Sequence, residues 1–241
     1  MIRMHPDSDL LVEYAAGSLS FAPCISVTTH LQYCATCCHS VESLKEIGGN
    51  MLDAGESMPV SDDLLDKILS CIEATADEDL SAKGSDINHA NGSNTNHAKG
   101  STAAPKRAVE DPIARDLPDY VRDLLPTREL NWRKLSSSLK VAPLSVGEDK
   151  YELALHRINA GGKAPSHDHT GQEITVVLKG SFSDEDGVYQ PGDFIVRHPG
   201  DKHRPFAARN EECICLSVLE APIRLTGIKR IFNPFLSFSP S

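Results

Sequence analysis

The sequence predicts a multidomain fold, in which a small all-α domain precedes an all-β domain. Apolar residues recur at helical spacing as far as about residue 75. Residues 76–110 are poor in large aliphatic side chains, and after residue 111 short β-branched segments are separated by Gly, Pro and Asp. We therefore expect a helical domain over 1–75, a flexible linker over 76–110, and an antiparallel β-sandwich or barrel over 111–241.

Two helices are predicted early in the chain. Asp7 or Ser8 can cap a short first helix, which Gly17 would end. A long second helix is expected from about Cys24 to Ile47, with Gly48-Gly49 as its stop.

A third helix is predicted to begin after Ser61-Asp62-Asp63. Its apolar side would carry five aliphatic residues, Leu64, Leu65, Ile68, Leu69 and Ile72. Beyond it, Ile87 is the one large aliphatic residue between residues 81 and 108. Such a segment cannot offset its ordering entropy by burial, so we interpret it, with His89 and His97, as a solvated linker.

The last part of the chain changes to a period of two. Residues 151–156 alternate along a predicted strand, and three further segments are short and rich in β-branched residues. These predicted strands are Ile174–Lys179, Asp193–Arg197 and Cys213–Leu219. Pro191-Gly192-Asp193 supplies a turn before one of them.

Charge and composition exclude several classes of function. The net charge is −10, so binding to the phosphates of nucleic acids is not expected. Aromatic residues make up 5% of the chain, so a surface on which the bases of single strands stack is not expected either. No signal peptide and no apolar run of membrane-spanning length are visible, which predicts a cytoplasmic protein without a membrane partner. Residues 1–75 hold 3 Lys and Arg against 11 Asp and Glu, a net charge of −8. The acidity therefore belongs to the helical part and suits a basic partner.

His30, Cys34 and Cys37 form the first candidate metal cluster. On one helix, positions i, i+4 and i+7 fall within a sector of about 60°. Two thiolates and two imidazoles are an ordinary tetrahedral zinc set, and we choose His5, just before the first predicted helix, as the fourth ligand. The alternative is that the cysteines only fill the core of a small domain.

The chain has seven cysteines and no export signal, which favours metal or redox chemistry over disulfides. Cys38 could be a spare or competing thiol, while Cys24 and Cys71 are predicted core residues. Cys213 and Cys215 share one face of a predicted strand. They either pack in the core or form a thiol pair facing a metal cavity.

The second candidate cluster is His167, His169, Glu173 and His203. The first two imidazoles lie on one side of an extended segment, and the other two ligands can return to that side after short connections. Three imidazoles and one carboxylate can bind zinc, iron, manganese or nickel. His198 is either a substitute ligand or a partly buried structural histidine.

The first cluster resembles the zinc-binding anti-sigma domain. The resemblance rests on the His-x3-Cys-x2-Cys motif at residues 30–37, the opening His5-Pro6, and the apolar stretch Leu10–Leu19. The resemblance implies that residues 1–75 clamp an extracytoplasmic-function (ECF) sigma factor and keep it from RNA polymerase.

The second cluster resembles the cupin superfamily, whose fold is a jelly-roll barrel. The first motif, Gly161-x5-His167-x-His169-x3-Glu173-x6-Gly180, matches throughout, whereas the second departs from the family pattern at His198 and Ala207. The order of the modules is similar to the ChrR-type anti-sigma factors. That resemblance implies zinc in both sites and release of the sigma factor by singlet oxygen or organic peroxide. The alternative is a cupin dioxygenase or isomerase with an accessory zinc domain. A small-molecule ligand of the cupin is compatible with both the anti-sigma and the enzyme hypothesis.

Overall fold

The computed structural model describes residues 2–57, 59, 61–72, 112–122, 124, 130–145 and 147–226. The chain divides into two units, one of Met1–Met51 with Val109–Ser241 and one of Leu52–Ala108. The predicted linker over 76–110 lies outside the described residues, so the three-part domain division stays a prediction. The named helices are α1 (Ser8–Ala16), α2 (Phe21–Leu31), α3 (Ala35–Asp53), α5 (Pro112–Asp116) and α6 (Asp119–Arg122).

Helix α1 confirms the predicted first helix at both ends. The Asp7 carboxylate accepts a hydrogen bond from the Leu10 amide at 2.8 Å, which satisfies one of the free N–H groups of the first turn. Gly17 follows the helix with φ of 70°, where its amide bonds back to the carbonyl of Tyr14.

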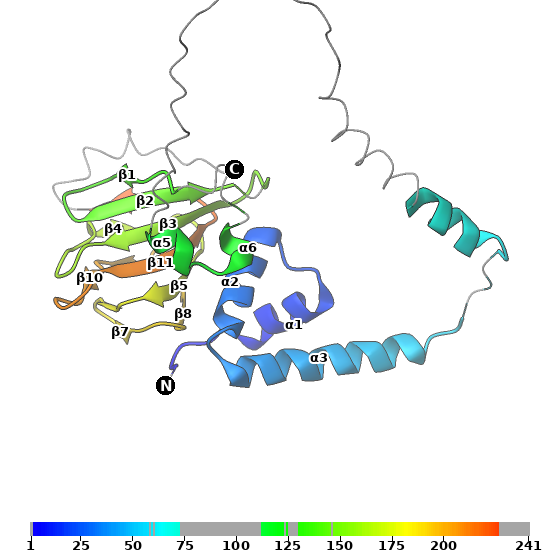
Figure 1. Cartoon of the computed structure of the whole chain (residues 1–241). Helices are drawn as coiled ribbons and strands as arrows, with labels where there is room; N and C mark the ends of the chain where they lie inside the picture. The colour runs from blue at the N-terminus through cyan, green and yellow to red at the C-terminus, as the bar shows by residue number, and fades with distance from the viewer. Residues whose placement is uncertain are drawn as a thin grey trace, which may run out of the picture. The chain divides into compact units, whose positions relative to one another are not determined.

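The predicted long helix from Cys24 to Ile47 is wrong, because the chain breaks it at residues 32–34. α2 ends at Leu31, and α3 begins at Ala35 in a different direction (Figure 1). Gly48-Gly49 does not end the second helix either, since α3 runs on to Asp53. Both glycines lie on an exposed stretch, where a helical glycine costs only about 1 kcal/mol relative to alanine.

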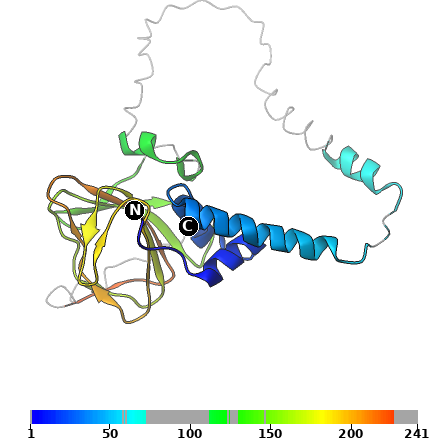
Figure 2. The ribbon, with the colours of Figure 1, turned by 90° about the horizontal axis from the view of Figure 1, so that it is seen from below.

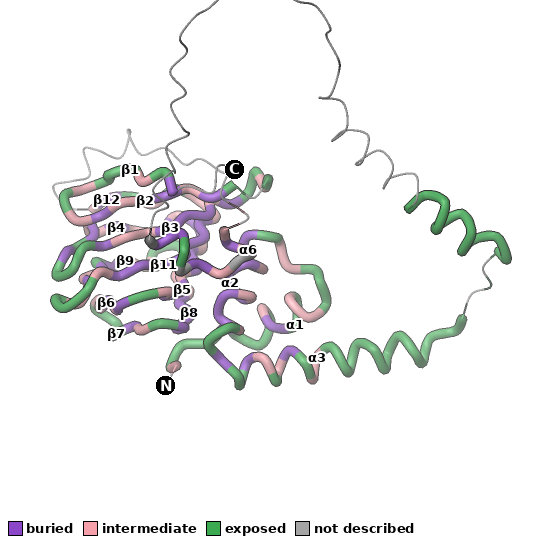
Figure 3. Tube along the Cα trace, viewed as in Figure 1, coloured by how far each residue is buried: buried purple, intermediate pink, exposed green. Residues whose placement is uncertain are grey.

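The predicted third helix is present over residues 64–72, in the second unit. The Lys67 ammonium pairs with the Asp63 carboxylate at 2.6 Å across the first turn. Every residue from 61 to 72 is exposed, including the five aliphatic residues of the predicted apolar side, and Figure 3 colours this segment as exposed.

The β region is antiparallel throughout its described pairings. Its strands form a six-stranded sheet (β1-β2-β3-β11-β5-β8) and two three-stranded sheets (β10-β6-β7 and β12-β4-β9). Figure 2 shows these strands closing into a barrel. Their bounds are β1 (Arg133–Lys134), β2 (Leu139–Leu144), β3 (Glu152–Ile158), β4 (His167–Asp168), β5 (Glu173–Lys179), β6 (Phe182–Ser183), β7 (Val188–Tyr189), β8 (Phe194–Arg197), β9 (Lys202–His203), β10 (Phe206–Ala207), β11 (Cys213–Leu219) and β12 (Arg224–Leu225).

The four predicted strands correspond to β3, β5, β8 and β11. Of the described strands without a predicted counterpart, β2 is the longest, and the others have two residues each. Pro143 lies within β2, and a proline inside a strand weakens the sequence signal for it. β11 is buried along its whole length, because the large sheet is covered on both faces. One face lines the barrel, and α2 packs against β5 and β11 on the other.

The helical and β regions of the first unit share one apolar core. Leu11 and Val27 from the helices belong to the same buried cluster as Leu155 and Leu216 of the sheet. Polar contacts add to it, since the Glu148 carboxylate caps the start of α2 by accepting from the amides of the helix's first two residues at 2.7 and 3.1 Å.

Among the described residues, no single helix is long and apolar enough to span a membrane. α1 and α2 together pass on length and composition, but they are bent by 108° relative to each other.

Candidate metal centres

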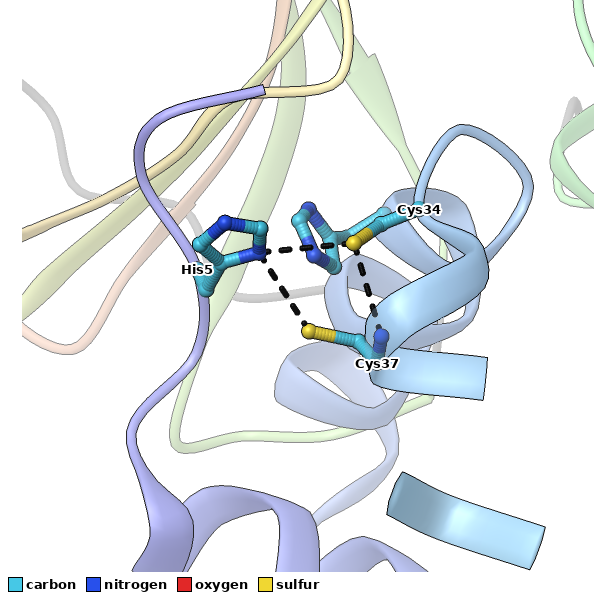
Figure 4. Close-up of side chains that lie close together, drawn as sticks. His5, Cys34 and Cys37 are labelled. Atoms are coloured by element: carbon cyan, nitrogen blue, oxygen red, sulfur yellow. Dashed lines mark hydrogen bonds between the residues drawn. The ribbon is translucent and has the colours of Figure 1, made fainter. Parts of the chain in front are cut away.

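The structure brings His5, His30, Cys34 and Cys37 together, with one ligand atom from each lying within 4.8 Å of the others. The Nδ1 atom of His5 is 3.4 Å from both sulfur atoms (Figure 4). Zn–N bonds of about 2.0 Å and Zn–S bonds of about 2.3 Å at tetrahedral angles would place nitrogen and sulfur about 3.5 Å apart. The spacing therefore fits one tetrahedral ion.

The four candidate ligands come from three elements rather than from one helix face. His5 precedes α1, His30 lies near the end of α2, and Cys34 and Cys37 flank the start of α3. The break between the helices turns the sulfur atoms back toward His30. The structure brings the four predicted residues together, although the predicted geometry of a continuous helix was wrong.

His30 has one ring nitrogen held and one free. Nδ1 lies 2.6 Å from the carbonyl oxygen of Gly192, whereas the buried Nε2 has no hydrogen-bond partner among the described residues. Burial lowers the pKa of His30, which keeps the imidazole neutral. A neutral imidazole that donates from Nδ1 presents its Nε2 lone pair to a metal ion.

The other cysteines of the helical part lie outside this group. Cys38 is half-buried and donates to the carbonyl of Leu31 at 3.0 Å. Cys24 is also half-buried, and Cys71 is exposed, so the prediction of a core position is wrong for Cys71. Cys71 lies in the second unit, on the helix over residues 64–72, all of whose residues are exposed.

His167, His169, Glu173 and His203 form the second group, again with ligand atoms within 4.8 Å of one another. All four residues are buried. The Nε2 atoms of His167 and His203 are 3.0 Å apart, and Oε2 of Glu173 lies 3.3 Å from Nε2 of His169. Strands β4 and β9 pair His167 directly with His203, and Glu173 opens β5.

A buried ion-pair network holds His203 in the second group. Its Nδ1 atom lies 2.9 Å from the Asp184 carboxylate, which also accepts from Arg197 at 2.6 Å and from the Tyr189 hydroxyl at 3.0 Å. Burial opposes the ionisation of Asp184, but the His203 hydrogen bond and the other donors outweigh it and lower the pKa of the carboxyl. The ionised carboxylate fixes the ring so that Nε2 faces the group.

Two of the other ligands of this group, His167 and Glu173, are also oriented by hydrogen bonds. Nδ1 of His167 lies 2.9 Å from the carbonyl oxygen of Pro165. Oε1 of Glu173 accepts from the Ser217 hydroxyl at 2.6 Å, which leaves Oε2 for an ion. Sequence reasoning missed Asp184 and Ser217, because they lie 19 and 44 residues from the side chains they hold.

We expect Asp184→Asn to weaken metal binding at the second group by about 10–100-fold, the usual effect of losing an outer-shell carboxylate. Chelator competition on the full chain would measure it. Asp186→Asn is the matched control, because Asp186 also pairs with Arg197, whereas the carboxylate that bonds to His203 is that of Asp184. Equal losses in both variants would contradict the assigned role.

The two groups differ in protonation. Burial, with neighbouring imidazoles assisting, lowers the pKa of His169 to about 4. Burial opposes ionisation of Glu173, but the surrounding imidazoles, His169 first, lower its pKa to about 2. In the first group, burial and then the hydrogen bond from Cys34 raise the pKa of the Cys37 thiol. That thiol is protonated at neutral pH until a metal ion displaces its proton.

Acidification should therefore release metal from the first group before the second. Above about pH 5, binding at the second group displaces no proton from Glu173 or His169. At the first group the Cys37 proton must leave, so affinity should fall by about tenfold for each pH unit lost below neutrality. Co²⁺ titrations from pH 8 to pH 6 would measure this, since the thiolate-to-cobalt absorption band follows the first group, and the total bound cobalt, less that share, follows the second. Earlier loss from the second group would contradict it.

A cavity of about 260 Å³ adjoins the second group. His156, His167, Glu173, His203 and Cys215 contribute to its otherwise mainly apolar lining. An apolar cavity with a few convergent polar groups is the usual form of a small-molecule site.

The two alternatives for Cys213 and Cys215 are both partly met. Both thiols are buried in the core of the barrel with their sulfur atoms 3.6 Å apart, and Cys215 lines the cavity.

His198 is exposed and lies outside the second group, so both predictions for it are wrong. Its strand, β8, ends at Arg197, after which the chain turns away toward Asp201.

Comparison with known proteins identifies the family of the chain and agrees with its fold. The family model described as "ChrR Cupin-like domain" matches residues 121–221. The anti-sigma-E factor ChrR of Cereibacter sphaeroides is 31% identical over 235 residues, which cover 97% of this chain and 98% of that protein. The chain belongs to the ChrR family of anti-sigma factors. Its helical N-terminal region followed by an antiparallel cupin confirms the predicted fold class.

One solved structure supports the ChrR family fold. A crystal structure of Rhodobacter sphaeroides SigE in complex with the anti-sigma ChrR matches with a TM-score of 0.65 and 27% identity, covering 91% of this chain and 100% of that chain. An RmlC-like cupin protein of Ralstonia eutropha matches with a TM-score of 0.39 and 21% identity, covering 44% of this chain and 72% of that chain.

Proposed function

We propose that this chain binds and inhibits an ECF sigma factor. The observation that carries the proposal is the match along nearly the whole chain to ChrR, which has been crystallised in complex with SigE. A partner of this kind acts at RNA polymerase, so the proposed compartment is the cytoplasm. We propose no direct contact with nucleic acid, because the helical part carries most of the negative charge.

Exposed apolar side chains on the helical part support a protein partner. Ile47 and Met51 on α3 are 57% and 73% exposed. The helix over residues 64–72, which Figure 3 colours as exposed along its length, carries five aliphatic residues that are 38% to 64% exposed. An amphipathic helix with an uncovered apolar face is a common mark of an interaction surface. The surrounding acidic residues would attract the basic surface of a DNA-binding protein.

Zinc is the proposed ion of the first group, because two thiolates and two imidazoles at tetrahedral spacing suit it. Zinc is also proposed for the cupin group, with iron, manganese and nickel as alternatives that three imidazoles and a carboxylate would accept. The first ion would tie the segment before α1 to α2 and α3 and so fix the shape of the binding region.

The proposed signal is oxidative, either singlet oxygen or organic peroxide, with the cupin as sensor. Strand β8 offers a short physical connection between the two groups. Its first residue, Phe194, bonds to Met4 beside His5, and its last residue, Arg197, bonds to Asp184 behind His203. Oxidation or loss of a thiolate at Cys34 or Cys37 would open the first group and release the partner.

A second candidate function is a cupin metalloenzyme, either a dioxygenase or an isomerase. The cavity of about 260 Å³ beside the second group supports it, because a bound substrate could reach the metal ion there.

Co-expression with the ECF sigma factor of the same genome would test the proposal. We expect the two proteins to co-purify and the complex to be inactive in transcription with RNA polymerase. Absence of a complex would overturn the anti-sigma proposal, and turnover of a substrate by the iron- or manganese-loaded chain would support the enzyme instead.

A further inference from the structure

Residues 190–194, which are the connection between β7 and β8 together with the first residue of β8, lie against the first metal group although they belong to the cupin. Gly192 has φ of 91°, and a Cβ atom there would come within 2.5 Å of Cβ of Tyr33 and 2.9 Å of Cδ1 of Ile2. A glycine is therefore needed for the cupin backbone to approach the helical region this closely. The approach occurs at Tyr33, in the break between α2 and α3.

This approach places two backbone groups of the connection against the candidate ligands. The Gly192 carbonyl lies 2.6 Å from Nδ1 of His30. The amide of Phe194 donates to the carbonyl of Met4 at 3.0 Å, and the Phe194 ring lies edge-on to the His30 ring with centroids 5.8 Å apart. His30 is thus oriented by the cupin on the side away from the metal group.

The Asp193 side chain holds the segment that carries His5. It is fully buried, and its Oδ1 accepts from the amides of Arg3 at 2.8 Å and Met4 at 3.2 Å. Its Oδ2 accepts from the amide of Gln190 at 2.9 Å, which closes the turn. One carboxylate therefore joins the cupin turn to the two residues directly before His5, across a sequence separation of 190 residues. Charge-assisted hydrogen bonds of this kind are among the stronger ones in proteins.

We propose that residues 192–194 of the cupin are the outer shell of the N-terminal metal site, with Asp193 as the positioning residue for His5. Two of the four ligands, His5 and His30, are held by the cupin, and the two cysteines are held by α3. The cupin therefore contributes directly to the metal affinity of the helical region. This inference rests on the proposed metal binding by the first group.

Asp193→Ala in the full chain tests the inference, with Co²⁺ as the probe. The thiolate-to-cobalt absorption band reports binding by Cys34 and Cys37, so the cupin group does not interfere. We expect the Co²⁺ affinity read from this band to fall by about 10–100-fold. Glu148→Ala is the matched control, because Glu148 also bonds two amides of the helical region but at the start of α2, away from the ligands.

A second pair of variants leaves the cupin intact. Arg3→Pro removes the amide that donates to Asp193 at 2.8 Å, whereas Arg3→Ala keeps it. We expect weaker Co²⁺ binding for Arg3→Pro but not for Arg3→Ala. The loss in the combined Arg3→Pro, Asp193→Ala chain should not exceed that of Asp193→Ala alone. If Asp193→Ala does not fold, the two Arg3 variants carry the test.

Three outcomes would overturn the inference: unchanged Co²⁺ affinity in a folded Asp193→Ala chain, an equal loss in Glu148→Ala, or losses that add in the combined chain. Failure of the metal site itself has a different signature, because the parent chain would then show no thiolate-to-cobalt band.

Discussion

Replacing Cys37 with serine in the full chain should remove the metal ion from the N-terminal group and lower the affinity for the sigma factor by at least about 100-fold. A hydroxyl cannot replace a thiolate as a zinc ligand at neutral pH. In small zinc domains the metal contributes about 10–16 kcal/mol of apparent binding free energy, much of which is folding free energy. Without the ion, three separate segments, before α1, at the end of α2 and at the start of α3, lose their common anchor. Metal analysis and calorimetric titration with the sigma factor would measure both effects.

Cys38→Ser is the matched control for Cys37→Ser. Cys38 is the neighbouring residue, it lies outside the metal group, and a serine hydroxyl there could still donate to the carbonyl of Leu31. We expect this variant to keep its metal ion and its affinity. Tight sigma binding by metal-free Cys37→Ser would show that the ion is dispensable for inhibition.

The sequence predicted the elements whose signals are local. Asp7 and Gly17 marked the ends of α1, because capping depends on residues within one turn. The break before α3 was missed because Gln32-Tyr33-Cys34 contains neither Gly nor Pro. There the chain responds to distant partners, since His30 bonds to Gly192 and Tyr33 donates to the carbonyl of Leu178. Tertiary contacts outweighed a helical pattern that continued through the break.

The same distinction applies to the metal centres. The spacing of His30, Cys34 and Cys37 identified the group even though the supposed single helix does not exist, because residues four and three apart also meet across a tight helix–turn–helix. The side chains behind the ligands could not be predicted in this way. Asp193 was expected only to contribute to a turn, and nothing local in the sequence indicates that it bonds to Arg3 and Met4.

Replacing Leu65 with aspartate should weaken sigma binding by about 10–100-fold while leaving the fold unchanged. Leu65 is 64% exposed, and Ile68 and Leu69 beside it on the same side of the helix are each 48% exposed. A substitution at such a surface position changes folding stability by less than about 0.5 kcal/mol. In the proposed complex the same side chain would be covered by the partner, where an unpaired carboxylate costs several kcal/mol.

Ser70→Asp is the charge-matched control for Leu65→Asp, because both add one negative charge to the same helix. At about 100° per residue, Ser70 lies about 140° around the helix from Leu65 and about 160° from Ile68. Repulsion or attraction by charge alone would change the affinity of both variants alike, whereas burial of the aliphatic side would affect Leu65→Asp alone. Affinities measured at low and at high salt separate the two causes further, since screening weakens long-range charge effects but not the cost of a buried carboxylate. Equal affinities for Leu65→Asp and the parent chain would show that the partner covers a different surface, leaving the exposed end of α3 as the next candidate.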